Sequence, residues 1–595
     1  MPITFLSNIQ NSFIIDTFFT CYFSIRALKL LEVSDERLAA GVSGNLHLEE
    51  AFLYVLEQFR KTYVCEHIQK ISLVYEVLKK NLGLQDENAL LTVFVRKIIT
   101  NLKFWWREER LFDATLALLN ELSLGYSAAR RIISLPDIQL LLNNHTGECF
   151  EFLSSIADLN AMHSRTMFYV SITRLMCVDF NDDESTFLSF MQPLSDNVRQ
   201  ICDVFAMSTT GVDQEQVKRA VIGLCRDIRG IAIACHMKSV YSMLFDWLYP
   251  NVFNIMLRSV ELWADCSTVM SAVLKLLVEL CQNRQQRLQF EMSSCSAVLL
   301  FREASKIICS FGERLLALPE VAPENAYKER YKHIASCFSA LKMSLSGGYV
   351  PFGVFRLYGD TCLQEALSTF MKLFMAIPSQ DFHSYQKVTQ SFYSLLECVA
   401  FDNIAYLSNV QPELFITILK YIQEGAVSLD GPVVNASCAT LDILLNYLYR
   451  RITQNTHPRV HVGSEPEGEE CIRALEAHPT VLSETLVVML DALLFDEVKC
   501  RWSMSRPLLG LILLQESAFQ QWKMELIAQY PQEKRASFEE AFTGLMDGVD
   551  RNLSVRNKDI FTQNLVLFRK RMYEVIRGTS TPVIQPVQST SDMMS

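Results

Sequence analysis

Apolar residues recur at helical spacing along almost the whole of this 595-residue chain. Steps of three and four residues place side chains on one face of an α-helix. No stretch of comparable length alternates with the period of two that a half-buried strand requires. The pattern therefore predicts an all-α protein. One example lies between Ser267 and Gln282, with apolar residues at Met270, Val273, Leu274, Leu277, Leu280 and Cys281.

The chain is far longer than one compact domain of about 100–200 residues, so it forms either several domains or one long repeat array. Glycine and proline are scarce, at 21 and 17 residues. They divide the periodic sequence into helices of roughly 12–20 residues. We expect Pro193 and Pro507 to be among these breaks, and Asp213 to cap the start of a helix. At about 40–47 residues per helix pair, the length accommodates about 12 repeats. The sequence thus predicts a HEAT-repeat α-solenoid, a superhelical array of antiparallel helix pairs.

We expect this array to cover residues 28–577. Residues 454–470 are polar, rich in proline and glycine and without periodicity, which predicts a mobile surface loop. Residues 578–595 have the composition of a disordered tail. Residues 1–27 are apolar but atypical, because Asp16 interrupts them and no basic residue precedes the apolar run. They indicate either a buried helix of a truncated first repeat or a non-native start.

No signature of catalysis or of cofactor binding appears in the sequence. Phosphate-binding glycine loops, HExxH metal motifs and GxSxG elbows are all missing. His457 and His461 have a spacing that suits a metal on a helix, but Pro458 and the polar surroundings favour a loop instead. The 17 cysteines are scattered and form no CxxC pair, so we expect reduced thiols. The sequence therefore predicts no enzyme activity, no cofactor and no metal site.

The net charge of −11 argues against a general nucleic-acid binder, which would carry a basic domain or stripe. The longest apolar segment near the amino terminus, residues 13–25, is shorter than the ~20 residues needed to span a bilayer. We therefore expect neither direct nucleic-acid binding nor membrane insertion. A modestly acidic surface suits contact with basic protein partners.

A run of four carboxylates lies between two helical segments, at Asp179, Asp182, Asp183 and Glu184. Clustered carboxylates attract a basic patch on a partner and speed its encounter. The alternative is a solvated turn between helices, whose acidic residues favour the amino terminus of the next helix. Both interpretations stay open from the sequence.

Several arginine pairs stand out, among them Arg226 with Arg229 and Arg284 with Arg287. Each pair could reach an acidic partner surface or a phosphate. Asp227, beside the first pair, favours the alternative of a structural ladder of ion pairs between successive repeats. A third pair, Arg501 with Arg506, offers the same choice. The six tryptophans all lie in helical segments, where core packing is the more common role.

Seven unusual segments resemble, in order, the carboxyl-terminal half of the exportin-7 family, within the importin-β (karyopherin) superfamily of nuclear transport receptors. The likeness extends from about Leu28 to about Arg577, and the amino-terminal half of the family is missing. The segments are IITNLKFW (98–105), LLNNHT (141–146), GLCRDIRGIA (223–232), NRQQRLQF (283–290), LLFREASK (299–306), YVPFGVFRLYGD (349–360) and RWSMSRPLLGLILL (501–514).

The resemblance implies a receptor that binds cargo protein together with RanGTP and carries both through the nuclear pore. It further implies contact with Phe-Gly nucleoporins and shuttling between nucleus and cytoplasm. Hydrolysis of GTP belongs to Ran, so such a receptor needs no catalytic residues of its own. The main Ran-binding repeats of the superfamily lie in the missing half. A truncated α-solenoid scaffold that binds proteins without Ran coupling is therefore the alternative, and a helical enzyme is the third, least supported one.

Overall fold

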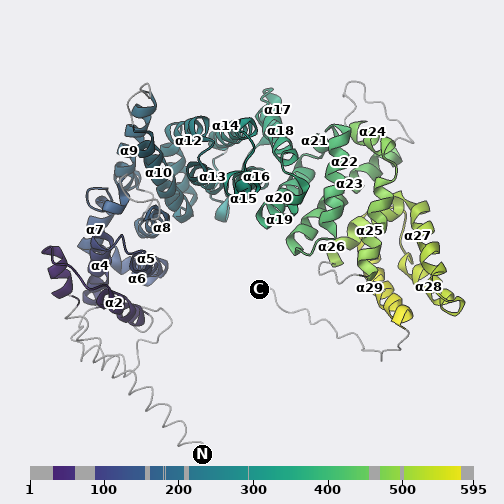
Figure 1. Ribbon diagram of the computed structural model, residues 1–595, viewed down its shortest axis with the longest axis horizontal. Helices are drawn as coiled ribbons and strands as arrows, with labels where there is room; N and C mark the ends of the chain where they lie inside the picture. The colour runs from purple at the N-terminus through teal and green to yellow at the C-terminus, as the bar shows by residue number, and fades with distance from the viewer. Residues whose placement is uncertain are drawn as a thin grey trace, which may run out of the picture. The chain divides into compact units, whose positions relative to one another are not determined.

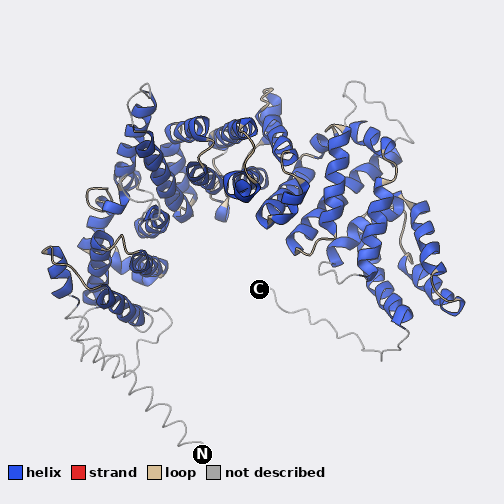
Figure 2. Ribbon diagram, viewed as in Figure 1, coloured by secondary structure: helices blue, strands red, loops and turns tan. Residues whose placement is uncertain are grey.

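The computed structural model of the chain describes residues 31, 33–60, 87–154, 161–178, 180, 183–206, 213–291, 294–454, 469–495 and 501–577. Every element that these residues form is a helix, and none is a strand (Figure 2). The prediction of an all-α fold is therefore confirmed.

The described residues group into two compact units, residues 1–377 and residues 378–595, where the sequence predicts one array over 28–577. The atypical segment 1–27 and the tail 578–595 lie outside the described residues. The same holds for the central part of the predicted loop, residues 455–468. Its edges, residues 454, 469 and 470, belong to helices.

Unit 1 is built from α-helices joined by short connections, some of which contain a single 3-10 or π turn (Figure 1). Its α-helices are α2 (Leu46–Phe59), α4 (Glu87–Phe104), α5 (Glu109–Leu124), α6 (Tyr126–Ile132), α7 (Pro136–Asn143), α8 (Arg165–Met176), α9 (Glu184–Ala206), α10 (Gln214–Ala234), α11 (Lys238–Leu248), α12 (Asn251–Trp263), α13 (Ser267–Cys281), α14 (Ser296–Ala317), α15 (Pro323–Ala326), α16 (Lys332–Ser346), α17 (Phe352–Leu357) and α18 (Cys362–Met375). The short turns are η2 (Glu151–Leu153), η3 (Ala161–Ser164), η4 (Arg284–Gln286) and the π turn η5 (Tyr327–Tyr331).

The longer helices of unit 1 form two layers. In layer A, helices α5, α8, α10, α13 and α16 each pack on the next one in that order. In layer B, α9, α12, α14 and α18 do the same. The layers join where α9 meets α10, α12 meets α13 and α14 meets α16. Stacking in which each repeat touches mainly its neighbours defines an α-solenoid, so this part of the prediction is confirmed as well.

Helix α13 shows why the apolar pattern produces this stacking. It packs on α10 along one side, on α16 along the other and on α12 behind. The six apolar residues of its predicted stripe have no exposed surface. A helix enclosed on three sides keeps only a narrow solvent face, and on α13 that face carries Lys275.

The predicted helix boundaries are partly right. The Asp213 side chain accepts a hydrogen bond from the backbone N–H of Glu215 at 3.0 Å and caps α10, as expected. The prediction that Pro193 and Pro507 end helices is wrong, since they lie inside α9 and α26 (Arg501–Leu514). Proline removes one backbone hydrogen bond, but buried apolar residues lie on both sides of it in the same helix. In α9, Met191 and Leu194 are buried, and such packing offsets the lost bond.

Helices α8 and α10 approach each other closely because α10 carries glycine at the contact. A Cβ atom on Gly230 would lie 2.8 Å from Cβ of Tyr169, and one on Gly223 would lie 2.7 Å from the Arg165 guanidinium. That guanidinium donates to both carboxylate oxygens of Asp227, at 2.7 and 2.5 Å. It also donates to the Leu153 carbonyl at 2.9 Å. Both charged side chains are buried, so the pair joins two successive repeats inside the protein.

Unit 2 repeats the two-layer arrangement. Helices α20, α23, α26 and α29 pack one on the next, while α22 packs on α25 and α25 on α27. An ion pair between the buried Lys558 Nζ and the half-buried Asp442 Oδ1, at 2.6 Å, joins α29 to α23. The helices are α19 (Ser379–Ser384), α20 (Gln386–Asp402), α21 (Ile404–Ser408), α22 (Pro412–Ala426), α23 (Gly431–Gln454), α24 (Glu469–Ala477), α25 (Val481–Phe495), α26 (Arg501–Leu514), α27 (Glu516–Ala528), α28 (Gln532–Leu545) and α29 (Val555–Arg577).

The tryptophans follow the core prediction only in part. Trp106, Trp263 and Trp522 are buried, but Trp502, in α26, is 64% exposed. The core prediction for Trp502 is therefore wrong.

Among the described helices, none by itself is long and apolar enough to cross a bilayer. The pair α24 and α25, bent by 76°, reaches that length and composition only in combination.

Replacing Asp227 with alanine should lower the free energy of unfolding by about 3–5 kcal/mol, because Arg165 is left buried without its counter-charge. Urea unfolding followed by circular dichroism measures the change. Asp203→Ala removes an exposed carboxylate from α9 and should change stability by less than about 0.5 kcal/mol. Equal unfolding midpoints for the two variants would contradict the structural role of the Arg165–Asp227 pair.

Candidate protein-binding surface

The structure describes two of the four residues of the predicted acidic turn. Asp179 and Asp182 lie outside the described residues, whereas Asp183 and Glu184 are exposed. Asp183 accepts hydrogen bonds from the Thr186 hydroxyl at 2.7 Å and the Ser185 backbone N–H at 3.0 Å. These bonds hold the pKa of the Asp183 carboxyl below its usual value. Asp183 therefore caps α9, while Glu184, the first residue of that helix, remains an exposed charge.

Arg226 and Arg229 are half-buried on the solvent face of α10, one helical turn apart. Burial and the positive charge of Arg165 lower the pKa of Arg226. Asp227, the residue expected to pair with them, points to the other side of the helix because successive residues do not share a face. Asp227 does form an ion pair between repeats, but it is one pair and its arginine is Arg165, whose signal in the sequence is no stronger than that of any other arginine.

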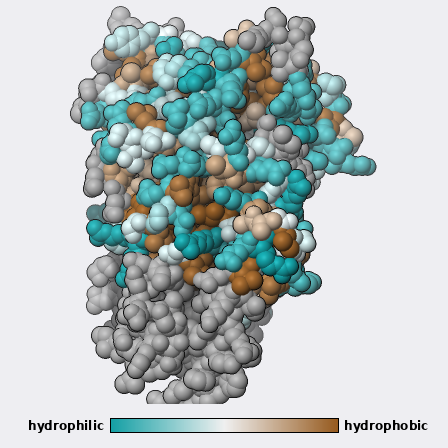
Figure 3. All heavy atoms as spheres, turned by 90° about the vertical axis from the view of Figure 1, so that its left-hand side faces the viewer, coloured by the Kyte–Doolittle hydropathy of each residue, from teal (hydrophilic) through white to brown (hydrophobic). Residues whose placement is uncertain are grey.

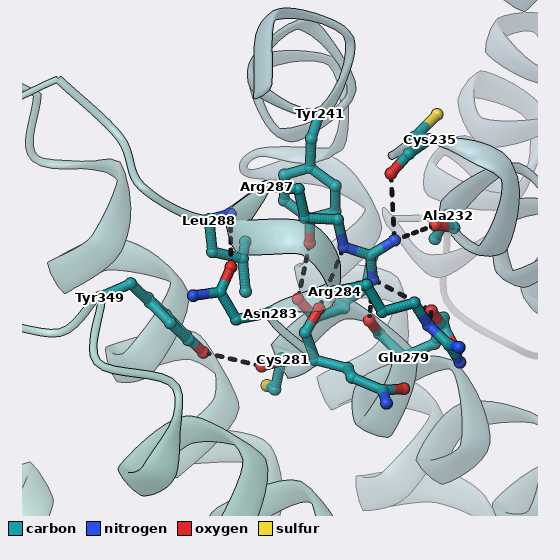
Figure 4. A network of polar contacts seen from close by, with 12 residues as sticks. Ala232, Cys235, Tyr241, Glu279, Cys281, Asn283, Arg284, Arg287, Leu288 and Tyr349 are labelled. Carbon is teal, nitrogen blue, oxygen red and sulfur yellow. Dashed lines mark hydrogen bonds and ion pairs between the residues drawn. The ribbon is translucent and has the colours of Figure 1, made fainter. Parts of the chain in front are cut away.

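Arg287 is buried, with 1% of its surface exposed, and lies at the centre of a polar network (Figure 4). Its guanidinium donates to the backbone carbonyls of Ala232 and Cys235, which end α10, and to the carbonyl of Gln282. It also donates to the carbonyl and carboxylate of Glu279, at 2.7 and 3.0 Å. All five guanidinium N–H groups are thus used within the chain.

The aromatic ring of Tyr241 completes this environment, with the Arg287 guanidinium carbon 4.7 Å from the ring centre. The loop that carries Arg287 is itself fixed, because the Asn283 side chain accepts from the Leu288 N–H at 2.8 Å (Figure 4). Partner contact through Arg287 does not fit this burial, and the residue holds α10, α11 and α13 together. The geometry therefore favours a structural role for Arg287 over contact with a partner.

Arg284 differs from Arg287 in its exposure. It makes a two-pronged ion pair with Glu279, at 3.0 and 2.9 Å, and its side chain is 39% exposed. The buried carboxylate of Glu279 therefore neutralises both Arg284 and Arg287. Arg284 keeps one edge in solvent.

Arg226, Arg229 and Arg284 lie on the same side of layer A together with further cations that the sequence did not single out. We call this set the basic stripe, and it consists of Arg226, Arg229, Lys275, Arg284 and Lys332, with the imidazole of His163 beside it. The stripe residues come from α10, α13 and α16 and from the turn η4 that follows α13. Lys275 gave no signal in the sequence because it stands alone among apolar residues of α13.

The side chains of the basic stripe are close enough to influence one another's protonation. Burial lowers the pKa of His163, and the nearby positive charges of Arg226, Lys275 and Lys332 lower it further. Burial likewise lowers the pKa of Arg229, with a contribution from Arg284. The Arg229 Nε atom is shielded from solvent and has no hydrogen-bond partner among the described residues. The side chains of the stripe thus lie close enough to act on one another electrostatically.

A second feature of unit 1 is apolar rather than charged. Its first described helices expose large apolar side chains, among them Tyr54 of α2, Tyr126 of α6 and Leu140 of α7. Figure 3 shows the side of the molecule that carries these helices, where apolar residues gather in a band next to residues drawn in grey. An inner repeat of a helix stack buries such residues against its neighbours.

Arg287→Lys should lower the free energy of unfolding by about 2–4 kcal/mol. Lysine has three donors and no planar fork, so buried carbonyls lose their partners. Arg284→Lys is the matched control on the same carboxylate and should change stability by less than about 1 kcal/mol, because Arg284 is partly solvated. Chemical unfolding of both variants measures the difference, and a larger loss for Arg284→Lys would refute the assignment.

Comparison with known proteins shows what this helix stack is similar to. A family model described as "Exportin-7-like, TPR domain" matches residues 15–161. Exportin-7-A of Xenopus laevis is 42% identical over 559 residues, which cover 93% of this chain and 51% of that protein. Ran-binding protein 17 of Homo sapiens is 39% identical over 577 residues, 96% of this chain and 52% of that protein. The chain thus spans about half the length of the curated relatives it matches. Along nearly all of its own length, the chain is therefore similar to about half of the length of the exportin-7 proteins.

Proposed function

We propose that this chain forms part of a nuclear transport receptor of the export class. In this proposal it binds cargo protein together with RanGTP and shuttles between nucleus and cytoplasm through the nuclear pore. The observation that carries the proposal is the 42% identity over 559 residues to a protein named Exportin-7-A. Relatives named Ran-binding protein 17 and Ran-binding protein 16 support Ran as the partner of the complete receptor.

The architecture is compatible with such a function. Each helix of layers A and B packs mainly on its neighbours in the stack, so small shifts at many contacts change the pitch. A partner that spans several repeats then favours one curvature and changes the affinity for a second partner elsewhere. Coupling of this kind typically amounts to about 1–3 kcal/mol. It requires binding surfaces and no catalytic residues.

The chain corresponds to about half of its relatives, and the main Ran contact is expected in the other half. A scaffold that binds proteins without Ran coupling is therefore the second candidate for this chain by itself. Contact with Phe-Gly nucleoporins belongs to the first proposal only. The two candidates differ in whether the nucleotide on Ran changes binding.

Immobilised purified chain, incubated with Ran loaded with GTP or with GDP, separates the two candidates. An amino-terminally extended version that completes the relatives' length serves as the positive control. Under the receptor proposal, the extended version retains RanGTP and not RanGDP. Retention of RanGTP by the short chain as well would place a switchable Ran contact in these repeats. Equal retention of both nucleotide forms by the extended version would refute the proposal.

The acidic turn is proposed as a contact for basic cargo, through the carboxylates at positions 179, 182 and 184. Replacing Asp182 and Glu184 with lysine, while keeping Asp183 to cap α9, should weaken binding of an arginine-rich probe peptide by about fivefold. Asp203→Lys with Glu313→Lys makes the same charge change at exposed positions in layer B and should have little effect. Fluorescence anisotropy measures both affinities. Equal affinities would leave the turn only its structural role.

A further inference from the structure

Two histidines of unit 1, His145 and His333, are buried, each with 1% of its surface exposed. A neutral imidazole has one donor and one acceptor nitrogen, whereas the protonated ring has two donors and a positive charge. The described histidines of unit 2, His383 and His478, are exposed instead. Protonation of a histidine would therefore disturb internal contacts in unit 1, whereas at His383 and His478 the charge would meet solvent.

His145 follows α7 and contacts two further helices. Its Nε2 atom donates to the Phe190 carbonyl of α9 at 2.9 Å, because a carbonyl can only accept. Nδ1 therefore carries no proton in the neutral ring, and it accepts from the Tyr169 hydroxyl of α8 at 3.2 Å. The centre of the imidazole also lies 5.5 Å from that of the Tyr169 ring and 4.8 Å from that of the Phe190 ring. Neutral His145 thus joins the segment after α7 to both layers of unit 1.

A positive charge on His145 would lack a counter-charge. Burial lowers the pKa of its imidazole to about 4, although the hydrogen bond to the Phe190 carbonyl acts in the opposite direction. Among the described residues, no charged group contributes to this shift. The charged side chains of α7, of the segment that carries His145, of α8 and of α9 are Asp137, Glu148, Arg165, Arg174, Glu184, Asp196, Arg199 and Asp203. Of these, Arg165 is paired with Asp227 and Arg199 with Asp196.

His333, in the first turn of α16, contacts α13. The Ser267 hydroxyl, at the start of α13, donates its one hydrogen to the Lys328 carbonyl at 2.8 Å. Its oxygen therefore accepts from Nε2–H of His333 at 3.1 Å. The other ring nitrogen, Nδ1, then carries no proton, and it is shielded from solvent without a hydrogen-bond partner among the described residues. A proton added there would be both a buried charge and a buried donor without an acceptor.

The charges around His333 oppose its protonation. Burial lowers the pKa of the imidazole to about 4, and the positive charges of Lys332 and Lys275 lower it further, against a smaller effect of the Lys328 carbonyl. Among the described residues, no carboxylate contributes to the shift. The charged side chains of α13, α14, η5 and α16 are Lys275, Glu279, Arg302, Glu303, Lys306, Glu313, Arg314, Lys328, Glu329, Arg330, Lys332 and Lys342. The ring of Phe311, on α14, lies 6.4 Å from the imidazole between centres.

The two histidines make the stability of unit 1 depend on pH. The unperturbed pKa of histidine is about 6.5. Above this value both rings are neutral whether the helices are packed or opened, so their contacts stabilise the packed form fully. As the pH falls from about 6.5 towards 4, the opened form binds protons that the packed form does not. Each histidine then favours opening by about tenfold per pH unit, which gives about thirtyfold at pH 5.

We propose that His145 and His333 form a pH-sensitive latch in unit 1. When neutral, they hold α8 to α9 and α13 to α16. When protonated, they release these helices while the packing of unit 2 is retained. Since repeats of a helix stack touch mainly their neighbours, contacts loosened at two positions allow its pitch to change. Acid would thereby alter the affinity for a partner that spans these repeats. The inference depends on neither Ran nor cargo, so its failure would leave the proposed function standing.

Hydrogen–deuterium exchange of the full chain at about pH 7.4 and about pH 5 tests the latch, with labelling times scaled for the intrinsic effect of pH on exchange. Between these two values, the protection of α8 and α16 should fall at least about tenfold more than that of α23, in unit 2. His145→Gln with His333→Gln should abolish this excess, because the glutamine amide donates a hydrogen bond and takes up no proton. The matched control, His47→Gln with His478→Gln, changes two exposed histidines and should keep the excess.

Circular dichroism at neutral pH shows whether each variant keeps its helicity. The unmodified chain is decisive even where the double variant does not fold, since equal loss of protection in α8, α16 and α23 overturns the proposal. It is also overturned if the folded double variant retains the excess loss, which would assign the acid sensitivity to other groups. Loss of the excess in the double variant, together with its retention in the control, supports the latch.

Discussion

Burial of charged side chains between neighbouring helices is the constraint on which the rest of this structure depends. A charge removed from water must be paired and hydrogen-bonded, so each buried pair fixes the distance and register of two helices. Arg165 with Asp227 does this for α8 and α10, and Lys558 with Asp442 for α23 and α29. Arg287 goes further, because it joins the carbonyl end of α10 to Glu279 of α13. Apolar packing supplies the driving force for stacking, and these pairs specify how the helices stack.

The same helices use charge in a second way. On α10, Asp227 faces inward, while Arg226 and Arg229, one residue before it and two after it, face solvent. On α13, the Glu279 side chain is buried, whereas the Lys275 side chain is exposed to solvent. Buried acids and partly exposed bases thus lie within a few turns of the same helices, α10 and α13.

Much of the fold could be predicted from the sequence, since an apolar stripe at steps of three and four has one structural solution, as α13 illustrates. The cap at Asp213 could be predicted for the same reason: it depends on local chemistry. Pro193 and Pro507 could not, because packing of distant helices keeps α9 and α26 continuous across them. The candidate binding surface was harder to predict from the sequence than the fold. Arg287 and Arg226 look alike in sequence, and only the fold buries Arg287 fully and leaves Arg226 half-buried. Lys275 joins the basic stripe through helix stacking, which no local pattern records.

Hydrogen–deuterium exchange of the unmodified chain, followed by mass spectrometry, tests most directly whether buried charges couple neighbouring helices into one unit. Opening of a helix stack proceeds through groups of residues that exchange together. The account predicts that the central amides of α8, α10 and α13 exchange slowest in unit 1 and at a common rate, because Arg165 and Arg287 join them. Exchange of α10 at the faster rate of α9, or separate rates for α10 and α13, would contradict it.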